Sequence, residues 1–273
     1  HLQPVGAFKI RGAWTAVSRL SETERARGIV THSSGNHGQA LAFAGKRAGV
    51  RTVVVMPESA PAIKVEGVRR HGAEVIAVTG PANERGRVAD ELAARDGLVL
   101  VPPYESHDVV AGQATCALEI LDAWEGVGTI VAPVGGGGLL AGACAAVRAL
   151  RPAVRVIGVE PVGAPKLSRA LEAGAPVTLD QTASLADGLL PMRIGSIPFG
   201  YIQNAVHDVV QVTDEEIADA VRFLYARMGL RIEPSGAATV AALLAGRVPA
   251  GGGVAAILSG GNVDPDLFAR LVA

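Results

Sequence analysis

The stretch TIVAPVGGGGLLA, residues 129–141, joins a run of β-branched residues to four successive glycines and then to an apolar, helix-forming run. A strand followed at once by a glycine turn and a helix is typical of a parallel β-α-β unit. Similar β-branched runs alternate with longer Ala-rich stretches elsewhere, at residues 28–31, 52–56, 74–78, 98–101, 154–159 and 254–258. The pattern predicts an α/β fold in which helices flank parallel sheets.

Composition limits the classes of protein that the chain can belong to. It has 273 residues, of which 49% are hydrophobic, so it can form one large or two modest domains. A net charge of -1 without a basic run argues against nucleic acid as a partner, and no apolar run of about 18 residues predicts a membrane span. Cys116 and Cys144 are expected to be reduced core thiols. We therefore expect a cytoplasmic protein that binds a small molecule.

The glycine run, Gly135 to Gly138, is suited to an anion such as a phosphate. Consecutive glycine N–H groups can point into one concavity, and the following helix adds the positive end of its dipole. The same residues allow a second hypothesis. Residues 136–141 fit the dinucleotide pattern G-x-G-x-x-G/A, and Glu160 follows the next strand, where an acid would bind a ribose. Taken alone, this pattern would indicate a nicotinamide-dependent oxidoreductase.

A second polar turn, THSSGNHG at residues 31–38, also lies between a predicted strand and a predicted helix. Its hydroxyls, amide and main-chain N–H groups at a helix start can bind a carboxylate. The simpler alternative is that Ser33, Ser34 or Asn36 caps the helix and that His37 is an ordinary surface histidine. Because a cap needs only one of these residues, the density of polar groups favours ligand binding.

Only four of the 25 lysines and arginines are lysines, and one of these, Lys9, lies between Phe8 and Ile10 in a glycine-flanked turn. Lysine, unlike arginine, can become a neutral amine and form an imine, and apolar neighbours lower its pKa by desolvation. A catalytic and a structural role for Lys9 are equally open at this point. In the turn ILSGGN, residues 257–262, Ser259 could bind a heterocycle nitrogen or simply end a strand.

Taken together, these turns resemble the fold-type II family of pyridoxal 5′-phosphate (PLP) enzymes, in its serine/threonine dehydratase and serine racemase branch. The oxidoreductase hypothesis gives Lys9 and residues 33–37 no role, so it becomes a distant alternative. The motifs that carry the resemblance are GAFKIRGA at 6–13, SSGNHG at 33–38, AGQ at 111–113, GGGG at 135–138, EPSG at 233–236 and SGGN at 259–262.

The resemblance implies the fold of the tryptophan synthase β type, with two interleaved domains of parallel-rich twisted sheets flanked by helices. The small mobile domain is expected at residues 29–108, and the large PLP-binding domain at residues 1–28 and 109–273. Closure of one domain on the other would expel water from the site. The resemblance also implies a homodimer.

The resemblance assigns roles to the matched residues. Lys9 would hold PLP as a Schiff base and move the Cα proton, while the glycine turn would bind the cofactor phosphate. Cofactor contacts are expected from Phe8, Lys9, Asn36, Gly135, Gly136, Gly137, Gly138, Leu139, Glu233 and Ser259. Contacts with the amino-acid substrate, mainly its carboxylate, are expected from Ser33, Ser34, Asn36, His37 and Arg85.

The expected reaction is the conversion of an L-threonine or L-serine type of substrate to a 2-oxo acid and ammonia. Ser259 would face the pyridine nitrogen as a neutral group, which makes the ring a milder electron sink and favours expulsion of a β-hydroxyl. Ser34 matches the racemase branch, where a serine returns a proton to the opposite face of Cα, whereas Tyr104 looks more like the dehydratases. Serine racemase and a dehydratase of 3-hydroxyaspartate or another hydroxy-amino acid are therefore alternatives.

The racemase branch also holds a divalent cation, with an acid after a Val-Glu-Pro strand, a main-chain carbonyl and a second acid. Here Glu160 supplies the first acid and Ala164 the carbonyl, but Lys166 stands at the position of the second acid. A protonated lysine cannot bind a hard cation, so no metal ligand is predicted. Either the Lys166 ammonium acts as a built-in cation, or the side chain points to solvent and water or a monovalent ion fills the space.

Overall fold

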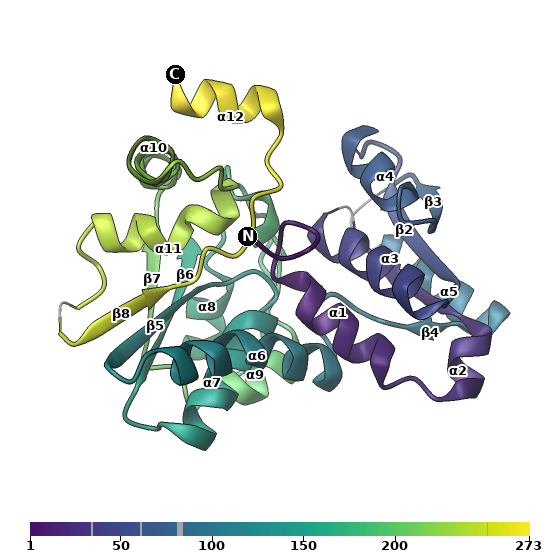
Figure 1. Cartoon of the computed structure of the whole chain (residues 1–273), viewed down its shortest axis with the longest axis horizontal. Helices are drawn as coiled ribbons and strands as arrows, with labels where there is room; N and C mark the ends of the chain where they lie inside the picture. Colours follow the sequence, from purple (N-terminus) through teal and green to yellow (C-terminus); the bar gives the residue numbers. More distant parts are fainter. Residues whose placement is uncertain (34, 61, 81–83, 250) are drawn as a thin grey trace. The chain divides into compact units, whose positions relative to one another are not determined.

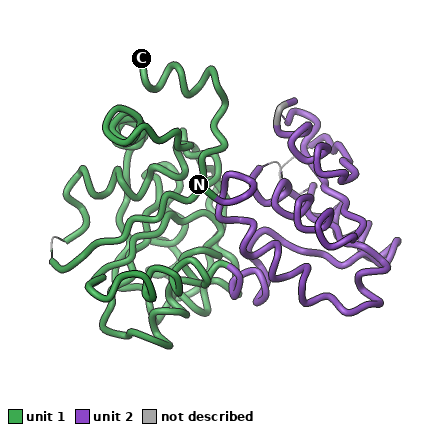
Figure 2. Tube along the Cα trace, viewed as in Figure 1, with its two compact units in different colours: residues 1–2, 113–273 green, residues 3–112 purple. Residues whose placement is uncertain are grey.

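The computed structural model describes residues 1–273 with the exception of residues 34, 61, 81–83 and 250. The chain forms two compact units, which Figure 2 distinguishes by colour. One unit consists of residues 3–112, and the other of residues 1–2 and 113–273. Each unit contains its own parallel sheet.

The unit of residues 3–112 is built on a four-stranded sheet of order β3-β2-β1-β4 (Figure 1). All neighbouring strands are parallel. Alternate residues of β2 face opposite sides, so Val53 and Val55 pack with α5 while Val54 and Met56 pack with α3 and α4. The strands are β1 (Ile29–His32), β2 (Thr52–Pro57), β3 (Glu74–Val78) and β4 (Val99–Leu100), and the helices are α1 (Lys9–Ser18), α2 (Glu22–Arg27), α3 (Asn36–Ala48), α4 (Ala62–Arg69) and α5 (Glu84–Asp96).

The second unit is built on a parallel four-stranded sheet of order β7-β6-β5-β8. Ile157 and Val159 of β6 pack into the cluster that contains α10 and α11, while Gly158 between them faces α7. Helix α6 (His107–Ala123) begins in the first unit and ends in the second. The remaining elements are β5 (Val127–Pro133), α7 (Gly138–Leu150), β6 (Arg155–Pro161), α8 (Lys166–Ala173), η1 (Asp187–Leu189), α9 (Ser196–Ile202), β7 (Asp208–Val212), α10 (Asp214–Met228), α11 (Pro234–Leu244), β8 (Gly253–Ala256) and α12 (Pro265–Val272).

The prediction of an α/β fold with parallel sheets flanked by helices is confirmed. Two local features differ from expectation. Strand β7 was not predicted, because it lies at a sheet edge and its short run DVVQV begins with an exposed residue. Lys9 is the first residue of helix α1 rather than part of a turn. Helix α1 forms here because Ala13 and Val17 share a buried cluster with Ala40 and Leu41 of α3.

Helices α1 and α2 belong to the unit of residues 3–112, whereas the expected large domain included residues 1–28. Which residues move together in domain closure stays a prediction. Neither Cys116 nor Cys144 forms a disulfide bond in the described part of the chain, and burial raises the pKa of Cys144 to about 12. Of the helices described, none combines the length and the apolar character that a membrane crossing requires.

Candidate active site

Lys9 opens helix α1 in the unit of residues 3–112, and its side chain is partly buried. Its Nζ donates a hydrogen bond to the main-chain carbonyl of Pro103 at 2.8 Å and lies 5.2 Å from the centre of the Phe8 ring. Desolvation lowers the pKa of this amine to about 8. A substantial fraction of the amine is therefore neutral near physiological pH, which is the form that can attack a carbonyl carbon.

His37 lies one residue into helix α3, which begins where the turn after β1 ends. The ring is 2% exposed, and its Nε2 is 3.0 Å from the carbonyl oxygen of Val101. Because a carbonyl only accepts, Nε2 carries the proton. Burial, followed by the charge of Lys9, lowers the pKa of His37 to about 3. The neutral ring thus presents a lone pair at Nδ1, for which the described residues offer no donor.

This tautomer bears on the predicted carboxylate site. A lone pair at Nδ1 repels a carboxylate, so any contribution of His37 would come from its main-chain N–H in the first turn of α3, where N–H groups have no acceptor within the helix. Ser33 is engaged locally, because its N–H donates to Val55 at 3.1 Å and its Oγ accepts from the N–H of Gly35 at 3.3 Å. Ser34 lies outside the described residues.

Residues that follow β4 bring two of the predicted site residues together. The carbonyl of Val101 accepts from His37 and the carbonyl of Pro103 accepts from Lys9. The charge of Arg85, near the start of α5, acts on His32 at the end of β1 and reinforces burial in lowering the pKa of that histidine. Arg85 is itself partly desolvated, which lowers its pKa. Lys9, His37 and Arg85 are therefore each linked to residues at or just after the carboxyl end of β1 or β4.

The glycine turn lies in the other unit, between β5 and α7. Gly137 has a φ of +95°, a left-handed conformation that favours glycine. A Cβ on Gly135 would lie 2.7 Å from the carbonyl oxygen of Gly188, so a side chain there would displace η1 or the turn. Gly138 and Leu139 begin α7, and their main-chain N–H groups belong to its first turn. The turn has the form of a cradle for a phosphate.

Two further predicted motifs lie next to each other in this unit. The N–H of Glu233, which precedes α11, donates to the carbonyl of Gly260 at 3.1 Å. Glu233 is 6% exposed and Ser259 is 3% exposed. The N–H of Gly188 donates to Ser235 Oγ at 2.9 Å, which links η1 to the same motif. The segment after α8 also reaches the glycine turn, since the N–H of Gly195 donates to Gly136 at 3.1 Å.

Gln113 is a further candidate for binding a ligand, and the sequence analysis assigned it no role. Its motif, residues 111–113, contributed to the resemblance but was given no function. The side chain is 1% exposed, and neither amide atom has a hydrogen-bond partner within the part of the chain that the structure describes. A buried amide without partners points to a group that completes its hydrogen bonds when bound. The sequence did contain a signal for this residue, because Gln113 is a polar residue within an otherwise apolar helical stretch.

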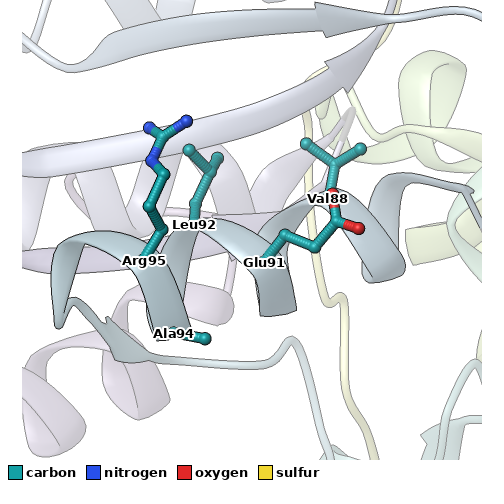
Figure 3. A pocket seen from close by; sticks show the side chains of 5 residues that line it. All are labelled: Val88, Glu91, Leu92, Ala94 and Arg95. Carbon is teal, nitrogen blue, oxygen red and sulfur yellow. The ribbon is translucent and has the colours of Figure 1, made fainter.

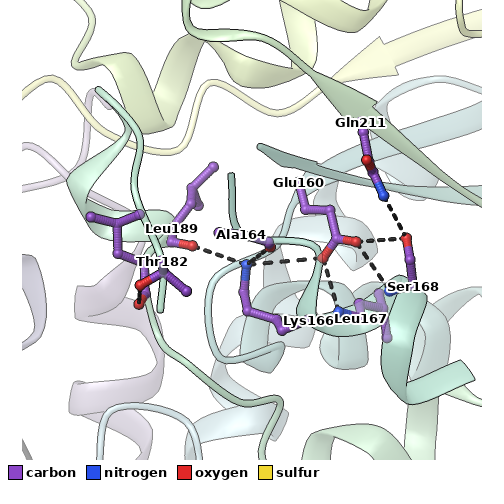
Figure 4. A network of polar contacts seen from close by, with 9 residues as sticks. Glu160, Ala164, Lys166, Leu167, Ser168, Thr182, Leu189 and Gln211 are labelled. Atoms are coloured by element: carbon purple, nitrogen blue, oxygen red, sulfur yellow. Dashed lines mark hydrogen bonds and ion pairs between the residues drawn. The ribbon is translucent and has the colours of Figure 1, made fainter. Parts of the chain in front are cut away.

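The structure removes the basis for a dinucleotide site. Glu160 is fully buried, and its carboxylate accepts hydrogen bonds from the N–H groups of Leu167 and Ser168 at 2.9 and 3.0 Å and from Ser168 Oγ at 2.6 Å (Figure 4). The carboxylate therefore caps helix α8. It is not available to a ribose, and the oxidoreductase alternative is wrong.

A surface depression on α5 offers no competing site. Its polar side chains form local ion pairs, Glu91 with Arg87 and Arg95 with Asp96. None of the residues predicted to bind a ligand takes part in it. Its lining, drawn in Figure 3, consists of Val88, Glu91, Leu92, Ala94 and Arg95.

Comparisons with known proteins identify the class. Residues 1–260 match the family described as pyridoxal-phosphate dependent enzyme. The chain is 39% identical to L-threo-3-hydroxyaspartate ammonia-lyase of Saccharomyces cerevisiae, over all of this chain and 84% of the relative. It is 38% identical to L-threonine ammonia-lyase of Thermotoga maritima, over all of this chain and 68% of the relative.

A comparison with solved structures supports the same family. Serine racemase of Dictyostelium discoideum superimposes with a TM-score of 0.90 at 39% identity, over 96% of this chain and 85% of that one. The chain belongs to the family of pyridoxal-phosphate dependent enzymes, and PLP is its cofactor. The predicted fold type and cofactor are confirmed. Within its own unit, the glycine turn fits a phosphate, and within the other unit the desolvated Lys9 amine fits an aldehyde; PLP carries both groups.

Proposed function

We propose that this chain is an ammonia-lyase that converts a small L-hydroxy-amino acid of the threonine or serine type to a 2-oxo acid and ammonia. The observation that carries the proposal is Lys9, whose pKa is lowered to about 8 by burial alone. A base that is partly neutral near physiological pH can take a proton from Cα and return one later. The names of the relatives, two of which are ammonia-lyases, support the same reaction.

The bound cofactor supplies an aldehyde for the Lys9 amine and a ring that withdraws electrons from the substrate Cα. Phe8 would lie beside the ring and Asn36 near its hydroxyl. The N–H groups of Gly135 to Gly138 and Leu139 would hold the phosphate. Glu233 and Ser259 would complete the cofactor contacts, with Ser259 at the pyridine nitrogen.

The substrate carboxylate would bind at the start of α3, through Ser33, Ser34, Asn36 and the main-chain N–H of His37. Lys9 would remove the Cα proton, and the β-hydroxyl would leave with a proton as water. Hydrolysis of the released enamine then gives the 2-oxo acid and ammonia. A neutral Ser259 at the pyridine nitrogen would not hold that nitrogen protonated, which would favour loss of the β-hydroxyl over a long-lived carbanion.

Arg85 favours a second candidate substrate, 3-hydroxyaspartate, which has an additional carboxylate. The guanidinium is partly desolvated at the carboxyl end of β1, and an arginine in such a setting binds carboxylates with two parallel hydrogen bonds. Replacement of Arg85 by Gln separates the two substrates. If Arg85 binds the second carboxylate, KM for L-threo-3-hydroxyaspartate rises by at least about tenfold, and KM for L-threonine changes much less. Equal changes would assign Arg85 to the carboxylate that all substrates share.

The test of the proposal is a panel assay on purified protein. L-serine, L-threonine, L-threo-3-hydroxyaspartate and D-serine are supplied separately, 2-oxo acid and ammonia are measured, and the remaining amino acid is analysed on a chiral column. Formation of 2-oxo acid from an L-hydroxy-amino acid supports the ammonia-lyase. Racemisation of serine without 2-oxo acid would instead support the serine racemase alternative, in which Ser34 is the proposed second base.

We also propose that the enzyme is a cytoplasmic homodimer that acts on a small molecule. The support is the resemblance of the chain to its family. Light scattering on purified protein tests the assembly, and twice the mass of one chain is expected. A particle with the mass of a single chain would contradict the dimer. Fractionation of cells that express the protein tests the location.

A further inference from the structure

Lys166 is a fully buried lysine that the proposed reaction does not use. It opens helix α8, and its side chain is 0% exposed. Figure 4 shows its Nζ directed toward three oxygens from three segments of the chain. It donates to the main-chain carbonyls of Ala164 and Leu189, both at 2.9 Å, and Glu160 Oε2 lies 3.9 Å away. The sequence-based alternative that Lys166 points to solvent is therefore wrong.

The Lys166 amine stays charged at neutral pH, although two features of its surroundings oppose the charge. Burial lowers the pKa of Lys166 to about 8, and the Glu160 carboxylate opposes that shift. The positive end of the α8 dipole also disfavours a cation at the first helical residue, so the two carbonyls and the carboxylate must compensate. The three donors of an ammonium match the three oxygens in number. At neutral pH the group is a cation held by oxygen atoms.

The same oxygens do not fit a divalent metal ion. Mg²⁺ and Ca²⁺ prefer six or more oxygen ligands with several negative charges, and here the space beside Glu160 and Ala164 is occupied by the Lys166 side chain. The start of α8 donates two hydrogen bonds to Glu160 Oε1 and one to Oε2, so Oε2 keeps one lone pair for the cation beside it. Within the described residues, no group of three or more His, Cys, Asp or Glu side chains could hold a metal ion.

The Lys166 cation is connected to the phosphate cradle through η1. Leu189, whose carbonyl accepts from Lys166, is the last residue of η1. Its neighbour Gly188 lies against Gly135, where a Cβ would approach the Gly188 carbonyl oxygen to 2.7 Å. The adjacent Leu190 carbonyl is held by Thr182 Oγ1 at 2.9 Å. A shift of η1 would therefore disturb the turn that is expected to bind the cofactor phosphate.

We propose that the Lys166 ammonium is a tethered cation that holds η1 against the glycine turn, so that the cofactor site forms without a divalent metal ion. A covalently attached cation is always present, whatever the concentration of metal ions around the protein. Removal of the ammonium in favour of a carboxylate should create a divalent-cation site from Glu160, the carbonyls of Ala164 and Leu189, and the new acid. The proposal does not depend on which amino acid is the substrate.

The test measures thermal unfolding and cofactor retention of the PLP-loaded protein in EDTA, in MgCl₂ and in CaCl₂. The variants are Lys166→Asp, Lys166→Met, which removes the charge without adding a ligand, and Lys46→Met as a matched control at an exposed lysine. Cofactor retention is followed by the loss of visible absorbance during dialysis. Calorimetric titration with Mg²⁺ and with Ca²⁺ measures metal binding directly.

The parent and Lys46→Met should show the same Tm in EDTA and in either metal salt, and no binding heat. Lys166→Met should unfold on the order of 10 °C lower and lose PLP several-fold faster, without a response to metal. Lys166→Asp should be destabilised in EDTA and recover at least half of the lost Tm in Mg²⁺ or Ca²⁺. Stabilisation of the parent by either metal, or unchanged PLP loss in Lys166→Met, would overturn the proposal. If Lys166→Asp folds only with metal present, that also supports it.

Discussion

Lys9 and Lys166 are two lysines with lowered pKa values in different units of the chain, and a comparison of them separates a reactive amine from a structural cation. Burial lowers the pKa of each to about 8, and each donates to main-chain carbonyls. The difference is the counter-charge. Lys166 has the Glu160 carboxylate at 3.9 Å and no exposed surface, whereas Lys9 is partly exposed and has no ion pair with any described residue.

The comparison teaches that a lowered pKa alone does not identify a catalytic lysine. An amine with one carbonyl acceptor can lose its proton and turn toward a ligand at little cost. If the Lys166 amine moved, the buried Leu189 carbonyl would lose its hydrogen-bond donor and the buried Glu160 carboxylate would lose its counter-charge. We therefore expect the reactive lysine to be Lys9, which has fewer hydrogen-bonding and charged partners than Lys166. The following predictions test that difference.

The largest effect is expected for Lys9→Ala. Loss of the amine removes both the attachment of PLP and the base for the Cα proton, so 2-oxo acid formation should fall by at least about 10³-fold. The visible absorbance of the bound cofactor should disappear as well. Lys46→Ala serves as the control and should keep both. Substantial activity in Lys9→Ala would transfer the catalytic role to another lysine and break the comparison.

A second prediction concerns the stability of the fold, for which the replacement of Lys166 should have a larger effect than the replacement of Lys9. Lys166→Met leaves Glu160 buried without its counter-charge and should lower the free energy of unfolding by about 3–5 kcal/mol. Lys9→Met removes one hydrogen bond and should cost about 1 kcal/mol or less. Urea unfolding of both variants and the parent, all stripped of PLP with hydroxylamine, measures the difference. Equal losses would show that the two lysines are held alike.

The third prediction concerns the glycine turn that Lys166 is proposed to support. A small side chain added at Gly135 tests whether the shape of this turn matters for PLP binding. Gly135→Ala places a Cβ 2.7 Å from the Gly188 carbonyl, so the turn or η1 must shift, and the Kd for PLP should rise by about tenfold or more. Gly200→Ala is the matched control, because a Cβ there meets nothing within 4 Å. A Kd for Gly135→Ala close to that of Gly200→Ala would show that this contact does not shape the cradle.

The smallest effect is a pH dependence at Lys9. Only the neutral amine attacks the aldehyde of PLP, and the lowered pKa means that the neutral fraction grows with pH and levels off above about 8. An exposed lysine would still be mostly protonated there, since its pKa is near 10.4. The rate of PLP uptake by the stripped protein, followed by absorbance from pH 6 to 10.5, measures this. A rate that still rises steeply above pH 10 would mean that Lys9 is not desolvated.

Much of the fold and several site segments could be predicted because their signals are local. The strand, glycine turn and helix around Gly135, and the polar turn before α3, are each encoded within about a dozen residues. The edge strand β7 was missed because it is short and begins with the exposed Asp208, which weakens the apolar pattern. The start of α1 at Lys9 was missed because its stability comes from packing on α3.

Features that depend on distant partners could not be predicted from the sequence. The tautomer of His37 follows from the carbonyl of Val101, 64 residues away. The inward direction of Lys166 follows in part from the carbonyl of Leu189, 23 residues away. The dinucleotide hypothesis failed for the same reason. The sequence placed Glu160 just after a strand, whereas it lies within β6, and it did not show that the start of α8 occupies the Glu160 carboxylate.

The central claim is that Lys9, and not Lys166, carries the cofactor. Reduction of the PLP-loaded protein with borohydride fixes the cofactor to the lysine that holds it, and mass spectrometry of peptides then locates the label. We expect a pyridoxyl group on the peptide that contains Lys9 and none on the peptides that contain Lys46, Lys64 or Lys166. A stoichiometric label on Lys166, with Lys9 unmodified, would contradict it.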